Sequence, residues 1–524
     1  MAGQPPILKF DDFRSELDNF LKKFNAGGSY ANNGQNGNRY NEDDDPYTGR
    51  RGGHATIPTG NAAALHVARR LTFGATPALV SEITTKGIQT WIDEQLNWQA
   101  IDDSAMDAIL ACYPGVTEEY ATLKSQPYRG QVTQNLQSAT MARAVWSRRQ
   151  LYELMVDMWT NQFNIDGSNG VVRPYKPADD VTVIRANALG KFSDLLMAAT
   201  KSPGMLMFLN NAQSRADGAN VPNENHAREL MELHTVGVGR GYSETDVVKV
   251  AHILSGWTVD KKGKFIFDAT RHDLGPASDG APILGWSRNG LTGVAAGESF
   301  LGHLARHSST AQKVAYKLCV RFIGDYIQPD DAIVAATAAN FIANDTAIAP
   351  TLRTLFQSDD FKASAGLKAR RPFEFIAGTL RAANITFDPT QSSQFQNVVN
   401  SRMNTLGQAL FAWSFPNGYP DGDYRWISAG SMLDRWNFAR KVSVDGFTVS
   451  MFDIDAILGT PAPTKVGGVI TKLANAVLAE PLDSAVYEYI LEATDLDADM
   501  RWQPWYDARP LLAYILQSPQ NQIR

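Results

Sequence analysis

Residues 223–258 carry charged and imidazole side chains at spacings that let them interact. Glu224, Arg228 and Glu232 fall at i, i+4 and i+8 of a predicted helix, so one guanidinium can bridge two carboxylates along one face. His234 falls on a second, apolar face, where an imidazole can cap the helix end or bond a main-chain carbonyl. The chemistry that this pattern offers by itself is an ion-pair network that orders helices.

The chain lacks the common motifs of catalytic and nucleotide-binding sites. It contains no Walker loop, no Gly-x-Ser-x-Gly elbow and no His-Glu-x-x-His helix. Gly237, Gly239 and Gly241 have the wrong spacing for a dinucleotide-binding loop and follow a predicted helix, not a strand. The two cysteines, Cys112 and Cys319, are too few for a disulfide framework or a four-cysteine zinc site. No standard nucleophile or phosphate loop is therefore predicted.

Composition excludes several classes of protein. The chain has 524 residues, of which 44% are hydrophobic and 20% are charged, so global disorder is excluded. A net charge of −6 argues against nucleic acid as a partner. No apolar run approaches the roughly 20 residues of a membrane span, and no signal peptide is visible at the N-terminus. Arg69-Arg70 resembles a twin-arginine signal but is followed by no apolar stretch, so localisation stays open.

The elements that must position these residues are predicted to be helices. Thr76-Pro77 starts one helix and Lys86-Gly87 ends it. Further helical patterns cover residues 141–159, 181–200, 331–358, 372–384, 402–413, 428–440, 469–479 and 484–493. Residues 264–268 give the best strand signal, and a long excursion follows at 275–297. We expect a mostly α fold, a single large multi-helical body with long loop insertions and one short hairpin near 264–285.

The first sixty residues differ from this body in composition. Residues 1–25 form a predicted amphipathic arm, whose helix over 8–24 carries one apolar stripe. The stripe consists of Phe10, Phe13, Leu17, Phe20 and Leu21. Residues 26–60 are rich in Gly, Asn and Asp, a composition that cannot fold alone. They are either a plain flexible linker or the tether of an arm that docks on a neighbouring subunit, and the helical body follows over 61–524.

Residues 223–258 read NENHARELMELHTVGVGRGYSETDVVKVAHILSGWT and resemble the signature of a bacterial family, domain of unknown function 1800. Members typically show Asn-Glu-Asn-aromatic-Ala-Arg-Glu-Leu, a Glu-Leu-His/Phe-Thr-Leu-Gly turn and a later Thr-Gly-Trp. Further segments resemble family motifs, and the resemblance spans about residues 61–524. These segments are Leu65 to Gly74, Trp159 to Phe163, Arg185 to Leu196, His272 to Gly275, Pro416 to Ile427 and Leu516 to Pro519. The resemblance implies a largely helical fold and, because many members look exported beside a second uncharacterised protein, a role in the cell envelope.

The resemblance also implies a candidate site, because family motifs concentrate His, Asn, Asp, Glu and Arg. Imidazoles and carboxylates together suit a divalent transition metal such as Zn, Fe, Mn or Cu. The candidate catalytic residues are Glu229, Glu232, His234, His272 and Asp273, and the metal ligands would be His234, His272 and Glu229. The expected supporting network is Asn161, Glu224 and Arg228. Such a site requires the loop that carries His272 to fold back over residues 223–236.

This chain departs from the family at several imidazole positions. It has Thr160-Asn161-Gln162 where relatives often have His-Asn-His, and Asn187 where they often have His. Amides hydrogen-bond but are poor ligands for transition metals. The departures favour a non-catalytic structural or assembly protein that self-associates or binds a protein partner through its N-terminal arm.

Two other functions remain open. One is a metal-dependent hydrolase or oxidoreductase that uses the Glu/His cluster of residues 224–273. The other is a protein that binds a polar ligand or glycan, for which Tyr419, Tyr424 and Trp426 could supply stacking surfaces, although core packing is the simpler role for them.

Overall fold

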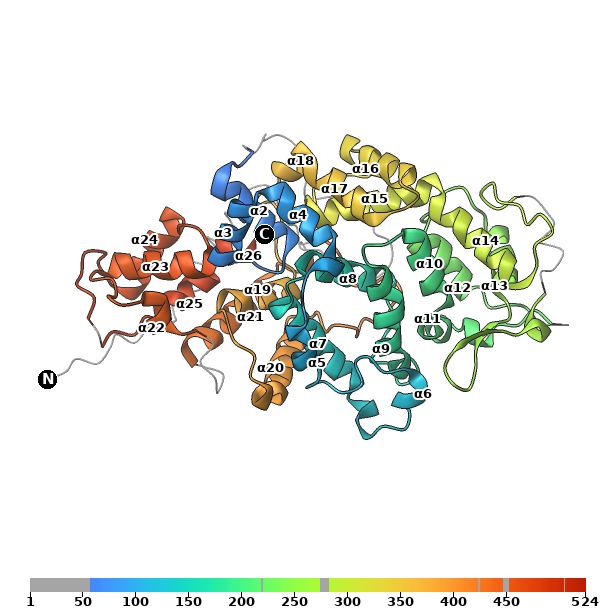
Figure 1. The fold of residues 1–524 in the computed structure, drawn as a ribbon, viewed down its shortest axis with the longest axis horizontal. Helices are drawn as coiled ribbons and strands as arrows, with labels where there is room; N and C mark the ends of the chain where they lie inside the picture. Colours follow the sequence, from blue (N-terminus) through green and yellow to red (C-terminus); the bar gives the residue numbers. More distant parts are fainter. Residues whose placement is uncertain (1–56, 218–219, 274–281, 423–424, 446–451, 504) are drawn as a thin grey trace.

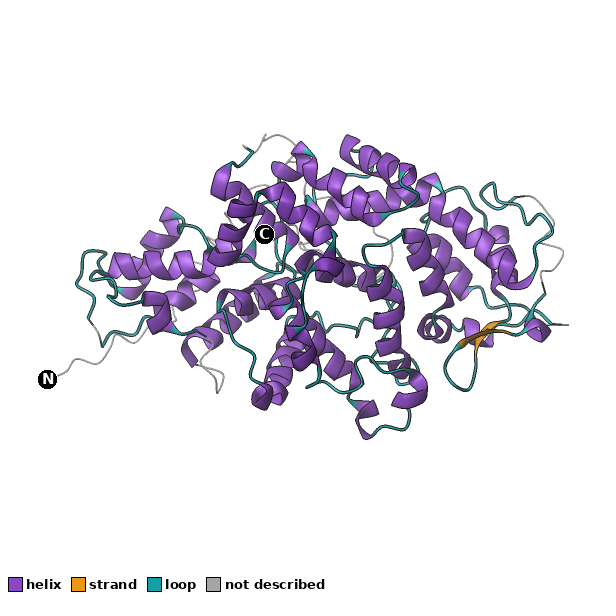
Figure 2. Cartoon of the chain, in the orientation of Figure 1, coloured by secondary structure: helices purple, strands orange, loops and turns teal. Residues whose placement is uncertain are grey.

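The computed structural model describes residues 57–217, 220–273, 282–422, 425–445, 452–503 and 505–524. These residues form a predominantly helical body (Figures 1 and 2). The predicted arm at 1–25 and most of the linker at 26–60 lie outside the described residues. Within the described ranges, no helix is both long and apolar enough to cross a bilayer.

The first half of the body consists of α-helices that mostly span three turns or fewer. Their bounds are α2 Gly60–Leu71, α3 Pro77–Lys86, α4 Ile88–Leu96, α5 Ala105–Leu110, α6 Tyr120–Leu123, α7 Val132–Trp146, α8 Gln150–Gln162, α9 Lys176–Asp179, α10 Phe192–Lys201, α11 Pro203–Phe208, α12 Asn225–Glu229 and α13 Glu244–Leu254. Two π-helical segments interrupt this series, at Asp180–Arg185 and Leu230–His234. Such segments often lie at functional or strained positions.

The second half continues in the same manner to the last residue. Its helices are α14 Gly293–Arg306, α15 Ser308–Phe322, α16 Ala332–Ala343, α17 Ile348–Gln357, α18 Asp359–Lys362, α19 Pro372–Ala382, α20 Ser392–Thr405, α21 Ala429–Arg440, α22 Ile454–Leu458, α23 Val466–Leu478, α24 Ser484–Thr494, α25 Arg509–Gln517 and α26 Pro519–Gln522. A third π-helical segment, Lys441–Asp445, extends α21.

One antiparallel hairpin is the only sheet among the described residues, and it joins β1 Trp257–Val259 to β2 Phe265–Phe267. The predicted strand at 264–268 is therefore correct. Its partner precedes it instead of following it, with Thr258 opposite Ile266. Trp257 is fully buried and lies 5.5 Å from the ring of Phe265, so aromatic packing beneath the hairpin selects this pairing.

Several predicted helices are shorter or interrupted in the structure. The pattern over 181–200 is divided between the π-helical segment Asp180–Arg185 and α10, and that over 331–358 is divided between α16 and α17. The predicted helix over 402–413 is wrong beyond Thr405, because Gly407 adopts a φ of +79° that ends α20. The continuous pattern over 141–159 is divided between α7 and α8, because the chain turns at Ser147–Arg149. There the Ser147 hydroxyl donates to Asp103, and Arg149 donates to the Ile101 carbonyl. Side-chain bonds from a distant loop thus override helix propensity.

A single hydrophobic core runs from α2 to α25. In Figure 1, helices α22–α25 gather at one end, α12–α14 gather at the other, and α2, α8 and α19 lie between them. The two ends of the described chain meet near the middle, where the amide of Arg524 donates to the Lys368 carbonyl and Arg70 donates to the main-chain oxygen of Arg524.

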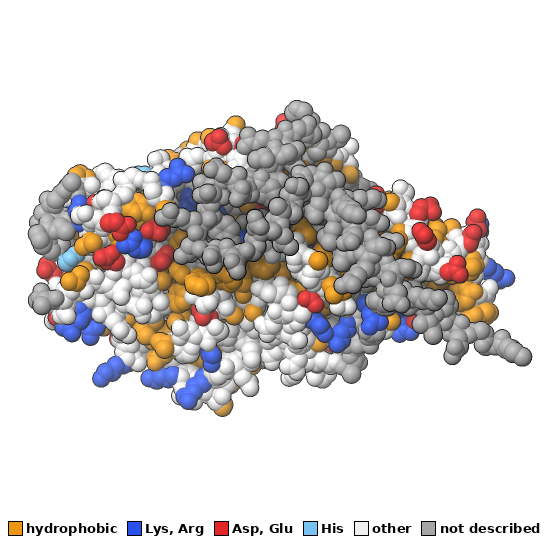
Figure 3. Space-filling view, turned by 180° about the vertical axis from the view of Figure 1, so that it is seen from behind, with side chains coloured by type: hydrophobic (Ala, Val, Ile, Leu, Met, Phe, Trp, Pro, Cys, Tyr) orange, Lys and Arg blue, Asp and Glu red, His pale blue; other side chains and the backbone are white. Residues whose placement is uncertain are grey.

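Apolar side chains are also present on the surface of the body. Val221, Val238 and Trp505 are each more than two-thirds exposed. On the face opposite to that of Figure 1, hydrophobic side chains gather near the middle, and basic side chains lie mainly along the lower edge (Figure 3). The body therefore offers apolar surface for contacts beyond its own core.

Candidate functional site

The segment that resembles the family signature folds as helix, glycine turn and helix, as predicted. Helix α12 continues into the π-helical segment Leu230–His234, and α13 follows after the turn. Ser243 and Asp246 form a capping box, in which each side chain accepts a hydrogen bond from the other residue's amide. The capping box fixes the start of α13 opposite the end of α12.

Arg228 bridges carboxylates in the predicted manner and gains one more. Its guanidinium lies 3.1 Å from Glu224, 3.4 Å from Glu232 and 2.7 Å from Glu244 of α13. The bonds to Glu244, followed by those to Glu232, raise the pKa of Arg228. Its side chain is 31% exposed, and that of Glu244 is 75% exposed. We call these four residues the Arg228 network, a partly solvated tie between α12 and α13.

Glu229 lies on the same helix but outside this network, and its side chain is half-buried. Burial, followed by the nearby charge of Glu232, raises the pKa of the Glu229 carboxyl. A carboxylate beside a second negative charge in this way attracts a cation or a proton.

His234 is buried at the end of the π-helical segment. Its side chain is 2% exposed, its ring lies 5.1 Å from the ring of Phe163, and its Nε2 has no hydrogen-bond partner among the described residues. His226 on the same helix is fully buried, and neither of its ring nitrogens has a partner there. Burial lowers the pKa of His234 to about 3 and that of His226 to about 4. Both imidazoles are therefore neutral near pH 7.

His272 occupies a different environment, beside the end of α13. Its Nδ1 lies 2.9 Å from the Ser255 carbonyl oxygen and 3.1 Å from the Ser255 hydroxyl, and its ring lies 5.0 Å from that of Phe267. Asp273 is exposed, and its carbonyl oxygen lies 2.9 Å from Nδ1 of His252. These bonds order the loop that follows the hairpin. The structure thus surrounds His272 with residues other than those around His234.

The predicted ligands do not form a recognisable metal centre. Within the described ranges, no group of three or more His, Cys, Asp and Glu side chains is placed to hold a metal ion. The structure brings Glu224, Arg228 and Glu232 together, and it joins His272 to the Ser255 main chain. Between residues 223 and 273, the buried imidazole nitrogens without a hydrogen-bond partner are Nε2 of His234, Nε2 of His272 and both nitrogens of His226.

Amide side chains near the end of α8 bond main-chain atoms of other segments. Asn161 donates to the carbonyl of Tyr419 at 2.8 Å and accepts from its amide at 2.6 Å. Gln162 donates to the Leu233 carbonyl at 2.7 Å. Asn164 donates to the carbonyls of Trp413 and Phe415. These residues tie α8 both to the π-helical segment and to the loop over 413–419.

The loop over 416–427 was a candidate for stacking on a sugar. Tyr419 is 9% exposed and Trp426 is 7% exposed, with their rings 5.9 Å apart. Tyr424 lies outside the described residues. The two described rings are packed against the body, so the structure places them in the anchoring role and not on an open binding face.

A buried ionic centre dominates the middle of the body, and sequence reasoning did not include it. Glu374 is 1% exposed and pairs with Arg321, Arg371 and Arg524. Asp157 of α8 pairs with the same Arg321 and Arg371. We call these five residues the Glu374 centre. Burial alone would raise the pKa of Glu374, but Arg524, Arg321 and Arg371 hold it well below its usual range.

Arg70 packs beside this centre and is also fully buried. It donates to the carbonyls of Ile323 and Ser364. Arg69-Arg70, which resembles an export signal in the sequence, is therefore a structural element of α2. The only signal for the centre in the sequence is the arginines in otherwise apolar segments, and the members of the centre come from four separate parts of the chain.

Several hollows among the described residues are large enough to receive a ligand or a side chain. One encloses about 410 Å³ and has Arg143, Glu153 and Arg185 at its base. There Arg185 pairs with Glu153 at 2.9 Å and with Asp180 at 2.7 Å. The base is therefore already neutralised by its own ion pairs.

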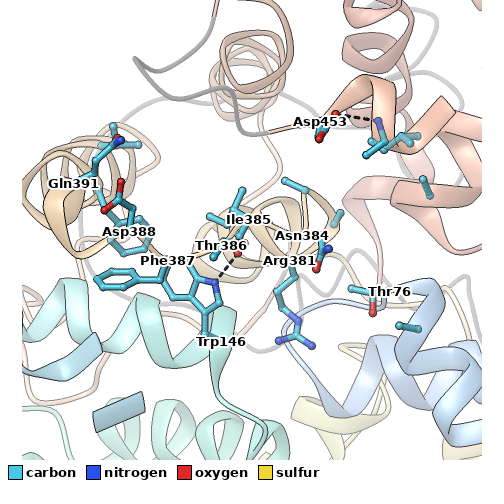
Figure 4. A pocket seen from close by; sticks show the side chains of 18 of the residues that line it. Thr76, Trp146, Arg381, Asn384, Ile385, Thr386, Phe387, Asp388, Gln391 and Asp453 are labelled. Atoms are coloured by element: carbon cyan, nitrogen blue, oxygen red, sulfur yellow. Dashed lines mark hydrogen bonds between the residues drawn. The ribbon is translucent and has the colours of Figure 1, made fainter. Parts of the chain in front are cut away.

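The second hollow encloses about 750 Å³ between the segment that follows α19 and helices α22 and α23 (Figure 4). We call it the aromatic groove, after the rings of Trp146, Phe387 and Phe395. The Trp146 ring lies 5.2 Å from the ring of Phe387 and 5.2 Å from that of Phe395. In Figure 4 the side chains of Trp146 and Phe387 lie on the opposite side of the hollow from Asp453.

Comparison with known proteins identifies the family. A family model described as "Protein of unknown function (DUF1800)" matches residues 66–523. No curated protein and no solved structure matches the chain. The matched residues include α8, the signature segment, α25 and every member of the Glu374 centre except Arg524. The chain therefore belongs to the DUF1800 family, whose members are proteins of unknown function.

Proposed function

We propose that this protein is a non-catalytic structural or assembly protein whose polar centre holds helices together. The observation that carries the proposal is the bond from Gln162 to the Leu233 carbonyl. Gln162 stands where the family resemblance leads us to expect an imidazole, and its amide is used to tie α8 to the segment that carries His234. A position suited to a ligand is thus used for packing between helices.

A second amide supports the same interpretation. Asn187, which also stands at an expected imidazole position, donates to the Val183 carbonyl one turn earlier at 2.7 Å. It therefore serves the local backbone at the end of a π-helical segment. An amide that donates to main-chain oxygen here takes the place of an imidazole, and amides are poor ligands for transition metals.

The assembly part of the proposal concerns the N-terminal arm. The stripe of five large apolar side chains over residues 8–24 is too hydrophobic to stay in water without a contact surface. The Gly/Asn/Asp-rich tether gives this stripe the reach to find one. We expect association with other copies or with a protein partner through the arm.

Light scattering of the purified protein tests the assembly part. Deletion of residues 1–55 and the full-length Leu17→Glu variant should both lower the associated fraction. Ser15→Glu is the matched control, because residue 15 lies on the opposite, polar face of the predicted helix. An association state that is the same in all four proteins would contradict the proposal.

Elemental analysis tests the non-catalytic part. The native protein should contain well below one transition metal ion per chain. A Thr160→His/Gln162→His variant restores two imidazoles of the family pattern, and its metal content per chain should be higher than that of the native protein. About one ion per chain in native protein, lost in His234→Ala/His272→Ala, would contradict the proposal.

A specific observation favours a metal-dependent hydrolase or oxidoreductase as the second candidate. The Nε2 atoms of His234 and His272 are buried and unbonded within the described ranges, and burial lowers the pKa of both rings. Neutral imidazole is the form that binds metal ions. Glu229 would be the acidic ligand, as the only carboxylate among the three predicted metal ligands.

A further inference from the structure

The aromatic groove has an apolar interior that the body leaves partly uncovered. Trp146, Phe387, Phe395, Val398 and Ile457 are all partly exposed there. A hollow of about 750 Å³ has room for several large side chains. Apolar surface of this kind is stabilised when another apolar surface covers it.

Several polar groups around the groove are bonded to the body. Arg381 donates to the carbonyls of Gly74 and Val145. Asp388 accepts from the Thr390 amide, and Asp453 accepts from the Ala456 amide. Both carboxylates are exposed and lie outside the cluster of the three aromatic rings. The aromatic part of the groove therefore fits an apolar occupant.

The chain enters the body next to this groove. Asn61, in the first turn of α2, lines a neighbouring hollow of about 340 Å³ together with Pro77 and Asn475. Pro77 also lines the aromatic groove, as does Ala476, the next residue of α23. The two hollows thus adjoin along α3 and α23, and the segment before residue 57 starts beside them.

The chain itself carries an apolar segment outside the described residues. Residues 8–24 hold the stripe Phe10, Phe13, Leu17, Phe20 and Leu21. About 30 residues of Gly/Asn/Asp-rich sequence separate this segment from residue 57. A flexible chain of that length has an end-to-end distance of roughly 30 Å, so the tether reaches the groove.

We propose that residues 8–24 of the same chain dock in the aromatic groove, with the Phe/Leu stripe against Trp146, Phe387 and Phe395. A short flexible tether holds the segment at an effective concentration of ~1 mM relative to the body of the same chain. Docking within one chain is therefore favoured over docking on a second copy in dilute solution. The inference rests on the proposed function, because it makes the groove the resting place of the assembly arm. A partner protein must then displace the arm from the groove before the partner can bind the arm.

Photo-crosslinking in the full-length protein tests the docking. A photoreactive benzoylphenylalanine at position 17 should crosslink within one chain to peptides from residues 384–398 or from α22–α23. The same group at position 33, in the tether, is the control and should give at least about fivefold less of these products. Crosslinks that are mainly between chains, or mainly to other surfaces, would overturn the proposal.

Hydrogen exchange gives a second readout that needs no crosslinker. In full-length protein, Leu17→Glu should raise exchange of residues 384–398 about tenfold, and Ser15→Glu should leave it unchanged. Equal exchange of residues 384–398 in both variants and in the wild type would contradict docking.

The groove can also be altered from its own side. Phe395→Glu should release the arm, lower the crosslink yield about tenfold and raise association by light scattering, whereas Val238→Glu, at a distant exposed position, should do neither. A wild-type crosslink yield in Phe395→Glu would overturn the proposal. If the crosslinks form as expected but the wild type and all variants stay monomeric, the docking proposal stands and the proposed assembly function is refuted.

Discussion

Two groups of arginines and carboxylates in this protein differ chiefly in their burial. In the Glu374 centre, the side chains of Glu374, Arg371 and Arg524 are at most 3% exposed. In the Arg228 network, the side chains of Arg228 and Glu244 are 31% and 75% exposed. Water screens the ion pairs of the Arg228 network and does not screen those of the Glu374 centre, so the same type of pair contributes differently to stability in the two groups.

The two groups also differ in what they connect. The Arg228 network joins two helices that are neighbours in sequence, α12 and α13. The Glu374 centre joins α8, α15, α19 and the last residue of the chain. The buried group therefore fixes the tertiary arrangement, while the exposed group reinforces a local turn.

The largest expected effect is on the Glu374 centre. Glu374→Gln leaves three buried arginines without their shared carboxylate, and we expect it to lower the free energy of unfolding by about 3–5 kcal/mol. Glu224→Gln makes the same change in the Arg228 network and is the matched control. Urea denaturation measures both. Similar losses in the two variants would remove the distinction between the groups.

The next effect concerns the contact between α8 and the loop over 416–427. Gly418 has a φ of +70°, and a Cβ added there would lie 2.2 Å from the Asn161 carbonyl oxygen. Gly239 has the same φ but has no atom within 4 Å of that position. Gly418→Ala should cost more than about 2 kcal/mol, while Gly239→Ala should cost about 1 kcal/mol. Thermal unfolding of the pair separates close packing from backbone strain.

Acidification should reveal the buried imidazoles. The folded-state pKa values of His226 and His234 are about 4 and 3, below the 6.5 of an unfolded chain. Between those values the unfolded state binds more protons, so stability is lost as the pH falls below 6.5. We expect a loss of about 2 kcal/mol from this pair by pH 5.5.

A His226→Leu/His234→Leu variant should have a flatter dependence of its unfolding free energy on pH over this range. The comparison with wild type is made by urea denaturation at pH 6.5 and pH 5.5. If the unfolding free energy of the variant depends on pH as steeply as that of the wild type, the two rings are hydrated in the folded state. The difference between buried and exposed charged groups would then not apply to these histidines.

The smallest effect is expected at the Arg228 network. Arg228→Ala removes three partly solvated ion pairs and should lower the free energy of unfolding by less than about 1 kcal/mol. The difference from wild type should shrink further in 1 M salt, because salt screens exposed charges. A loss as large as that of Glu374→Gln would show that exposure does not decide the contribution of these pairs.

Much of the fold could be predicted from local patterns. The helices over 372–382, 429–440, 466–478 and 484–494 agree with their predicted spans within about three residues, since apolar periodicity and caps act over one or two turns. The failure at Gly407 also has a local cause, because a glycine with positive φ ended a pattern that continued past it. The strand at 264–268 was predicted correctly, but its partner was not, because pairing depends on where the Trp257 ring is buried.

The candidate site was predicted only in part. The bridging of carboxylates by Arg228 followed from i, i+4 spacing within one helix. Glu244 was missed because it enters from the next helix. Whether His234 and His272 lie close together could not be predicted from the sequence, because it depends on how the loop after β2 folds.

The sequence by itself determined the family, the helical character of the body and the contacts made within a single turn, such as the Ser243–Asp246 capping box. These features depend on residues three or four apart, which a helix always brings together. Only the tertiary structure decided the Glu374 centre, because its members come from residues 157, 321, 371, 374 and 524. Burial of such charges is tolerated when every partner is in place, and that condition is met by packing across the whole chain.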